Sequence, residues 1–291
     1  MPIPIDAALD DASAQAADKA RLLRTPLRYA APAALAGAYV GVAVVLLASV
    51  AGPLAAAASP TVKLVQGAVF GIALTLVVFA GADLFTGNNM TMLIGWRRGT
   101  VRGRDALLVN VASLIGNLVG AVAFAAIVHA SGILDAAVKG KAPAGDALIK
   151  AIVTAKMRAT DGQLFWRAVL CNMLVCLGLW MAMRTRSDAA KLIVLFWALL
   201  AFIASGFEHS VANMTIFSLA VLHGDATWGA LAHNLLLTVP GNVVGGALIV
   251  GLPYAMGARA RRVAEGNAHS APVSQPASGA ESESEPVPAL V

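Results

Sequence analysis

The chain has 291 residues, of which 58% are hydrophobic and only 13% are charged, and its formal net charge is +5. Soluble domains are roughly 45–50% apolar and about 25% charged, so this composition excludes an ordinary water-soluble globular enzyme. The apolar residues lie in long blocks, which indicates a protein that crosses a membrane several times.

Six apolar blocks follow an amphipathic N-terminal stretch. Residues 1–27 hold no apolar run long enough for a signal peptide, and they suit either a helix lying on the membrane surface or a solvated arm. The blocks lie near 29–52, 63–95, 106–131, 165–183, 190–222 and 229–256. A helix needs about 20 residues to cross the hydrocarbon, so the second and fifth blocks are too long for one simple span. We expect a channel domain of six transmembrane helices over residues 28–256.

The basic residues predict the orientation. With both termini in the cytoplasm, 14 of the 21 lysines and arginines face inward, and six of the other seven fall in or beside the long connection 132–164. An excess of Lys and Arg marks cytoplasmic loops. We therefore expect a multi-pass protein of the inner (plasma) membrane with both ends cytoplasmic. Residues 257–291 are rich in Pro, Ser, Ala and Glu and are predicted to be a disordered cytoplasmic tail.

The second and third blocks are repeated in the fifth and sixth. Both halves have a glycine followed two residues later by an acid, then Asn-Met-Thr, and then a Gly-Asn-x-Val-Gly string. Gly81 and Gly116 are 35 residues apart, and so are Gly206 and Gly241. Three spans in each repeat give the second repeat the opposite orientation in the membrane, which is the inverted-repeat plan of channels and transporters.

Glycine and polar residues interrupt the second and fifth spans near mid-membrane. Gly81, Gly87 and Gly206 tolerate unusual backbone angles. We interpret Asn88, Asn89 and Asn213 as satisfying the freed peptide groups. Asp83 and Glu208 are the only acids inside the apolar blocks, and we interpret them as bonding exposed backbone donors of the breaks.

His209 is the candidate functional residue. It lies within the second break, beside Ser210, and an imidazole can be neutral or cationic near neutral pH. Lys156 lies in the long outer connection, where it serves either as a solubilising charge or to concentrate anions at an outer rim. Large apolar residues near the breaks are core packing by default, and they could also form hydrophobic constrictions.

At these motifs the chain resembles the formate/nitrite transporter family of pentameric, aquaporin-like anion channels. The segments that carry the resemblance extend across all six spans. They include Gly81-Ala-Asp-Leu-Phe-Thr86, Gly116-Asn-Leu-Val-Gly120, Asn172-Met-Leu-Val-Cys-Leu177, Gly206-Phe-Glu-His-Ser-Val-Ala-Asn-Met214 and Gly241-Asn-Val-Val-Gly245.

The resemblance implies roles for individual residues. It makes His209 the central pore histidine, Asn172 its polar neighbour, Thr86 a residue of the loop that breaks the second span, and Lys156 a periplasmic lysine near the pore mouth. Two apolar constrictions would be formed by Phe70, Leu74, Leu84, Phe85, Val175 and Phe202. Gly87-Asn88-Asn89 departs from the family, whose formate channels carry small hydroxylated residues there.

The expected function is passage of a small monovalent anion, formate first, through one pore in each protomer of a homopentamer, as a channel or by anion/proton symport. Nitrite is the nearest alternative, and hydrosulfide, acetate and lactate remain open. An intramembrane enzyme is the alternative of a different class, although Glu208-His209 lacks the spacing of a zinc protease motif. Neither a cofactor, a metal nor a nucleic-acid partner is expected.

Overall fold

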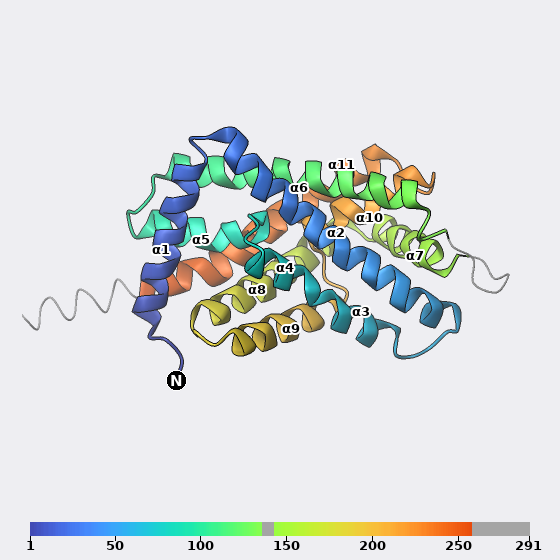
Figure 1. Cartoon of the computed structure of the whole chain (residues 1–291), viewed down its shortest axis with the longest axis horizontal. Coiled ribbons are helices and arrows are strands. Elements are labelled where there is room, and N and C mark those ends of the chain that lie inside the picture. The colour runs from blue at the N-terminus through green and yellow to red at the C-terminus, as the bar shows by residue number, and fades with distance from the viewer. Residues whose placement is uncertain (136–142, 258–291) are drawn as a thin grey trace, which may run out of the picture.

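The structure is a computed structural model that describes residues 1–135 and 143–257. Within these ranges the chain folds into helices without any strand (Figure 1). The helices are α1 (Ile5–Leu22), α2 (Pro26–Ala56), α3 (Val62–Phe70), α4 (Ile72–Phe79), α5 (Phe85–Arg97), α6 (Gly103–Ser131), α7 (Ala144–Arg158), α8 (Asp161–Met183), α9 (Asp188–Ala204), α10 (Ser210–Leu222), α11 (Trp228–Val243) and the π-helical segment η1 (Val244–Gly251).

The predicted spans are confirmed as helices. Five stretches of the described chain are long and apolar enough to cross a membrane, namely Pro26–Ala56, Val62–Phe79, Gly103–Ser131, Asp161–Met183 and Trp228–Gly257. The fifth predicted block contains α9, of 17 residues, and α10, of 13 residues. Neither half is long enough to cross the hydrocarbon alone, so this span is made of two half-helices. The fold is an all-α membrane protein.

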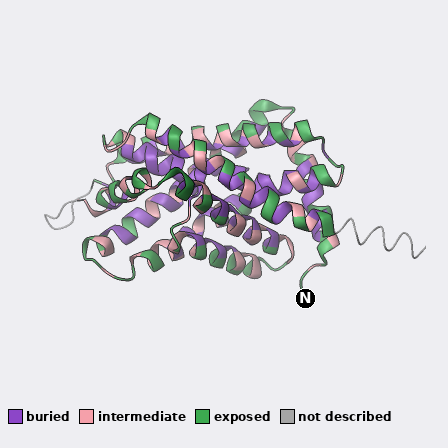
Figure 2. Cartoon of the chain, turned by 180° about the vertical axis from the view of Figure 1, so that it is seen from behind, coloured by how far each residue is buried: buried purple, intermediate pink, exposed green. Residues whose placement is uncertain are grey.

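Side chains on the outside of the bundle suit an apolar environment. Figure 2 shows that buried residues lie on the inner faces of the long helices and exposed residues on their outer faces. Among the exposed residues are large apolar ones on α6, including Leu107, Ile115, Val119 and Ile127. Such a surface would be unfavourable in water and is suited to lipid or to a neighbouring subunit.

Helices of each half pack closely at glycines of the repeated Gly-Asn motif. α2 packs along α6 in the first half, and α8 packs along α11 and η1 in the second. A Cβ atom on Gly120 would lie 1.8 Å from the carbonyl oxygen of Ala34, and one on Gly245 would lie 2.2 Å from that of Val169. A side chain at either position would push the helices apart, so small residues are required there.

Both predicted breaks are present and have the same backbone geometry. The first separates α4 from α5, and the second separates α9 from α10. Gly81 has φ +76° and Gly206 has φ +74°, in the left-handed region that favours glycine. The break after α4 is closed by a hydrogen bond from the N–H of Ala82 to the carbonyl of Val77, at 2.9 Å. Phe207 bonds to Phe202 in the same way after α9, at 3.0 Å.

One expectation about the first break is wrong. Thr86, Gly87, Asn88 and Asn89 were expected in the interrupting loop, but they form the first turns of α5. The loop ends at Leu84, and the helix restarts at Phe85 because the side chain of Asn117 accepts the backbone N–H of Phe85. The polar run is therefore helical.

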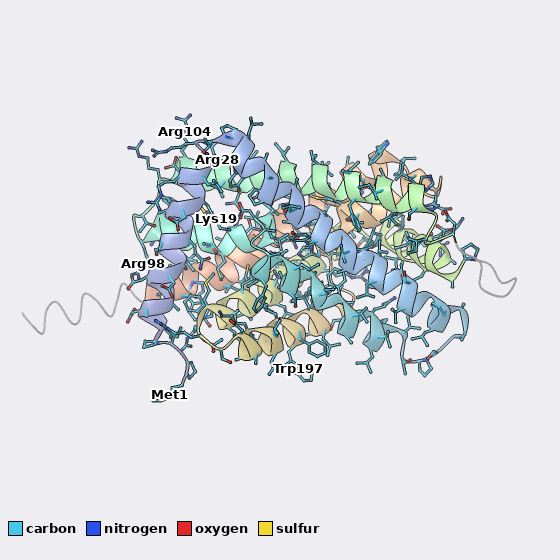
Figure 3. The ribbon with its side chains drawn as sticks, in the orientation of Figure 1. Met1, Lys19, Arg28, Arg98, Arg104 and Trp197 are labelled. Carbon is cyan, nitrogen blue, oxygen red and sulfur yellow. The ribbon has the colours of Figure 1, made fainter. Side chains whose placement is uncertain are left out.

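The N-terminal stretch forms α1, which crosses one end of the bundle (Figure 1). Ala8 and Leu9 of α1 belong to one apolar cluster with Val250 and Ala255 near the end of the described chain. The basic side chains of Lys19, Arg28, Arg98 and Arg104 lie at this same end (Figure 3). Contact of α1 with the membrane surface stays a prediction. The predicted tail 257–291 lies, apart from Gly257, outside the described residues.

Candidate functional site

Two asparagines, one in each repeat, satisfy the backbone at the breaks. Oδ1 of Asn117 on α6 accepts the N–H of Phe85 at 2.9 Å, and Oδ1 of Asn242 on α11 accepts the N–H of Ser210 at 2.9 Å. These N–H groups are the first donors of α5 and α10, which lack an intrahelical partner. The Nδ2 group of Asn117 donates to the carbonyl of Asp83 at 3.0 Å, and that of Asn242 to the carbonyl of Glu208 at 3.1 Å.

The interpretation of Asn88, Asn89 and Asn213 as partners of freed peptide groups is wrong for the part of the chain that the structure describes. Oδ1 of Asn88 accepts from Lys19, and Nδ2 of Asn213 donates to Glu208 and to Asn234. Nδ2 of Asn89 is buried without a hydrogen-bond partner among the described residues. Asn117 and Asn242 take the expected role, and the repeated Gly-Asn motif was the sequence signal for them.

The two membrane-embedded acids bind lysines rather than backbone donors, which corrects a second interpretation. Oδ1 of Asp83 lies 2.5 Å from Nζ of Lys19, and Oε2 of Glu208 lies 2.6 Å from Nζ of Lys156. All four side chains are largely buried, with exposed fractions from 3% for Glu208 to 26% for Lys19. At each break an asparagine already holds the first backbone donor, and His209 holds the N–H of Ala212 at the second break.

The lysines of these pairs come from helices outside the repeats. Lys19 lies on α1, and Lys156 lies on α7 within the long connection. Lys156 is therefore no freely solvated charge, since its side chain is only 12% exposed. Sequence reasoning missed Lys19, because nothing in the pattern of residues 1–27 sets it apart from the neighbouring arginines.

His209 caps α10 and faces the opposite half-helix. Its Nδ1 accepts the backbone N–H of Ala212 at 3.1 Å, so this nitrogen carries a lone pair. The proton of the neutral ring therefore lies on Nε2, which is 3.1 Å from Oγ1 of Thr86 in the first turn of α5. This contact joins the two repeats at their breaks.

Thr86 is held in place by α8. Nδ2 of Asn172 donates to the carbonyl of Thr86 at 3.1 Å and to the carbonyl of Asn242 at 2.6 Å. Sγ of Cys176, one turn further along α8, also donates to the Thr86 carbonyl, at 3.3 Å. Asn172 thus has no hydrogen bond to His209 and positions Thr86 and Asn242 instead.

A cavity of about 40 Å³ adjoins His209 on the α7 side. Its walls are mostly apolar and include Phe70 and Phe202, with Lys156, His209 and Asn213 as the polar members. The Phe202 ring stacks on the His209 ring with centroids 5.8 Å apart and meets the edge of Phe70, also at 5.8 Å. This volume holds a small ion or a few water molecules.

A larger cavity of about 770 Å³ opens at the α1 end of the bundle. Leu84 at the first break and Gly87 in the first turn of α5 line it together with Lys19 and Asp18 of α1. The two cavities reach the breaks from opposite sides, the smaller at the second break and the larger at the first.

The six residues expected at constrictions are all buried, but only some of them line the cavities. Phe70 and Phe202 line the smaller cavity, and Leu84 lines the larger one. Leu74, Phe85 and Val175 belong to the surrounding core and line neither cavity.

The sequence profile described as "Formate/nitrite transporter" matches residues 6–256. The chain is 41% identical over 247 residues to the nitrite transporter NirC of Salmonella typhimurium, covering 82% of this chain and 88% of that protein. It is 42% identical over 236 residues to a probable formate transporter of Methanothermobacter thermautotrophicus, covering 76% and 85% of the two chains.

Two solved structures are similar throughout the bundle. An FNT family ion channel superposes with a TM-score of 0.78 at 39% identity, covering 85% of this chain and 97% of that one. A pentameric formate channel with formate bound superposes with a TM-score of 0.65 at 25% identity, covering 80% and 97%. The four proteins are named as transporters or channels and not as enzymes, so the enzyme alternative is set aside.

Proposed function

The chain belongs to the formate/nitrite transporter family, and on that premise we propose that each protomer conducts a small monovalent anion past His209. The carrying observation is the contact between His209 Nε2 and Thr86 Oγ1, where the two half-helices meet beside a small cavity.

This point is suited electrostatically to an anion. An ion pays a large desolvation cost in an apolar constriction such as the one that Phe70 and Phe202 form. The N-termini of α5 and α10 both lie here, since Thr86 is in the first turn of one helix and His209 caps the other. Helix N-termini carry partial positive charge, and the imidazole N–H and the threonine hydroxyl add two hydrogen-bond donors.

The cap bond at His209 limits how a proton can be coupled to the anion. A cationic ring would carry a hydrogen on Nδ1, directly opposite the N–H of Ala212. We therefore propose that the resting ring is neutral and becomes cationic only when an anion lies against it and compensates the lost cap bond. A proton from the aqueous side binds Nδ1 as the cap bond opens, and the cationic ring gives its Nε2 proton to the anion, which crosses as the neutral acid. The ring is then neutral with its proton on Nδ1, and loss of that proton together with uptake of another from solution at Nε2 restores the cap bond to Ala212.

Exchange of His209 for asparagine tests this step. Asparagine is among the best helix-capping residues and can accept the same backbone N–H, but it cannot carry a proton. In proteoliposomes, His209→Asn is expected to keep a folded protein and to lose the acceleration of anion uptake at low pH. Unchanged proton coupling in this variant would contradict the role of His209.

Formate is the proposed substrate, with nitrite as the second candidate because a relative at 41% identity over 88% of its own length is named a nitrite transporter. Formate is supported by a relative of equal similarity and by the solved channel with formate bound. Counterflow of labelled formate and nitrite in the same vesicles separates the two, and larger uptake of nitrite at equal gradients would overturn the assignment of formate.

We further propose a homopentamer in the inner membrane with both termini cytoplasmic. The solved formate channel that the chain resembles is pentameric, and the exposed apolar face of α6 suits either lipid or such a contact. The basic cluster at the α1 end supports a cytoplasmic location for that end. Native mass spectrometry of the detergent complex tests the first point, and cysteine labelling of the termini in sealed cells tests the second.

A further inference from the structure

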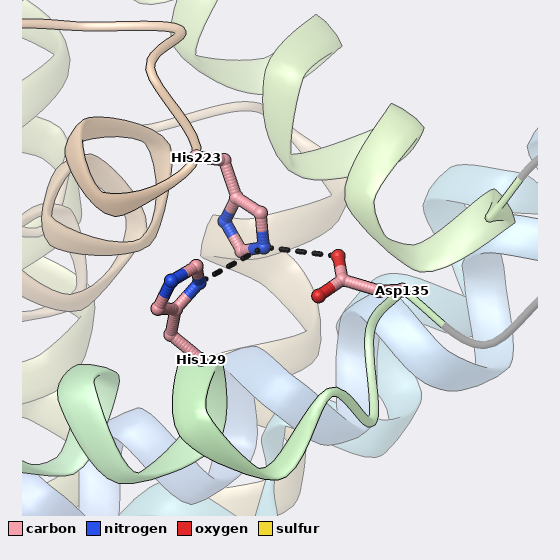
Figure 4. Close-up of side chains that lie close together, drawn as sticks. All are labelled: His129, Asp135 and His223. Atoms are coloured by element: carbon pink, nitrogen blue, oxygen red, sulfur yellow. Dashed lines mark hydrogen bonds and ion pairs between the residues drawn. The ribbon is translucent and has the colours of Figure 1, made fainter.

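Three side chains outside the pathway converge at the end of the bundle away from α1. His129 belongs to the last turn of α6, Asp135 to the turn that follows it, and His223 caps the C-terminus of α10 (Figure 4). One ligand atom of each lies within 4.8 Å of the ligand atoms of the other two.

Nε2 of His223 faces a carboxylate and a second imidazole. Its Nδ1 lies 2.8 Å from the carbonyl oxygen of Leu219, and because a carbonyl only accepts, Nδ1 carries the proton. Nε2 of the neutral ring then carries a lone pair instead of a proton. It nevertheless lies 3.0 Å from the carboxylate oxygen Oδ1 of Asp135, and it lies 3.4 Å from Nδ1 of His129. A positive group must separate the lone pair from the carboxylate, either a proton on Nε2 or a metal ion between them.

The surroundings of the cluster favour a cation. The carboxylate of Asp146 lies 3.8 Å from Nδ1 of His223. The C-termini of α6 and α10, whose exposed carbonyls carry partial negative charge, also end here. Lys150 on α7 is paired with Asp225, and this hydrogen bond raises the pKa of Lys150, with a smaller contribution from the charge of Asp146. Lys150 therefore offsets only part of the negative charge around the cluster.

We propose that His129, Asp135 and His223 form a binding site for a divalent transition metal ion of the zinc class. Two imidazole nitrogens and one carboxylate oxygen are borderline ligands, which select zinc or its neighbours over calcium and magnesium. In a tetrahedral zinc site with bonds of about 2.1 Å, ligand atoms are roughly 3.4 Å apart. Nε2 of His223 lies 3.0 Å from Oδ1 of Asp135 and 3.4 Å from Nδ1 of His129, and all three ligand atoms lie within 4.8 Å of one another. The bond from Nδ1 of His223 to a backbone carbonyl is the support that metal-binding histidines normally have.

A metal at this position would link two parts of the transport domain. His223 ends the half-helix that His209 begins, and His129 and Asp135 belong to the end of α6 and its following turn. The ion would therefore fasten the outer end of α10, and the fourth coordination position would remain open to water.

The site can be tested on the full-length, tag-free protein after treatment with a chelator. Zinc titration by calorimetry is expected to give one ion per protomer, with no comparable binding of magnesium. The double variant His129→Gln/His223→Gln is expected to weaken zinc binding by about 10-fold or more. His233→Gln is the matched control, because His233 also lies near a carboxylate, Asp161 at 3.3 Å, but without a third ligand.

A second readout separates loss of ligands from misfolding. Cobalt bound in place of zinc is expected to give visible absorption bands of a site with nitrogen and oxygen ligands in the wild type and in His233→Gln, but not in the double variant. Gel filtration and circular dichroism check that the variants remain folded. The proposal is overturned if the wild type binds zinc no more tightly than the double variant, or if His233→Gln loses as much affinity as the double variant does.

Discussion

Nζ of Lys156 lies 2.6 Å from Oε2 of Glu208, and Nδ2 of Asn213 donates to the same oxygen at 2.8 Å. The carboxylate follows Phe207 and precedes His209 in the chain, so the lysine of an outer helix is connected to the residue that caps α10. The equivalent pair at the first break, Lys19 with Asp83, is more exposed. The outer lysine is thus a structural part of the second break as well as a charge near the entrance.

Lys156→Met is expected to destabilise the protein strongly. It leaves the Glu208 carboxylate, only 3% exposed, without its cation, and removing one partner of a buried ion pair costs roughly 3–5 kcal/mol. The measurement is the thermal unfolding of the variant in detergent, together with anion uptake in proteoliposomes.

Lys150→Met is the matched control, because Lys150 lies on the same helix in an ion pair whose lysine is 61% exposed. It is expected to leave stability nearly unchanged. Adding Glu208→Gln to Lys156→Met removes the uncompensated charge and is expected to restore much of the stability. Equal effects of the two single lysine variants would contradict the structural role of Lys156.

The architecture of the breaks was predictable because it rests on local sequence. The repeated glycines predict chain reversals of unusual φ, and Gly81 and Gly206 have such angles. The position of His209 within the second break followed from the same motif. The helical state of Thr86 was missed, because a run of Gly and Asn indicates a loop by local preference, whereas a distant side chain starts the helix there.

Partners across long sequence separations could not be predicted from the pattern. Asp83 and Lys19 are 64 residues apart, and Glu208 and Lys156 are 52 apart. The sequence shows that a membrane-embedded acid requires a partner, but the choice between backbone and lysine depends on how α1 and α7 dock on the bundle. The functional roles of His209, Thr86, Asn172 and Lys156 stay predictions.

Asn117→Ala is expected to lower stability by about 2–4 kcal/mol and to reduce transport. It leaves the N–H of Phe85 and the carbonyl of Asp83 without partners, and each buried unsatisfied group costs roughly 1–3 kcal/mol. Asn110→Ala on the same helix is the control, since Asn110 only bonds the carbonyl one turn before it. Denaturation midpoints of the two variants make the comparison, and similar midpoints would contradict the role of Asn117.

Thr86→Val removes the hydroxyl that faces Nε2 of His209 while keeping the shape of the side chain. If the hydroxyl stabilises the anion, its loss should slow uptake about 10-fold, the equivalent of one hydrogen bond of roughly 1.4 kcal/mol. Thr86→Ser keeps the hydroxyl and is expected to transport at near the wild-type rate. Uptake by stopped-flow measurement in proteoliposomes checks both, and equal rates in Val and Ser variants would show that the hydroxyl takes no part.

Phe202→Ala is expected to widen the smaller cavity beside His209 and to relax the selection of anions by size. Phe202 stacks on His209 and contacts the edge of Phe70, so removal of its ring joins new space to the cavity beside the imidazole. The ratio of lactate uptake to formate uptake should rise, while stability falls by about 3–5 kcal/mol, as for other buried Phe→Ala changes. Phe196→Ala is the control, because Phe196 lies on the same helix but is 37% exposed and does not line the cavity. If the ratio of lactate uptake to formate uptake is unchanged in a folded Phe202→Ala protein, Phe202 does not limit the size of the transported anion.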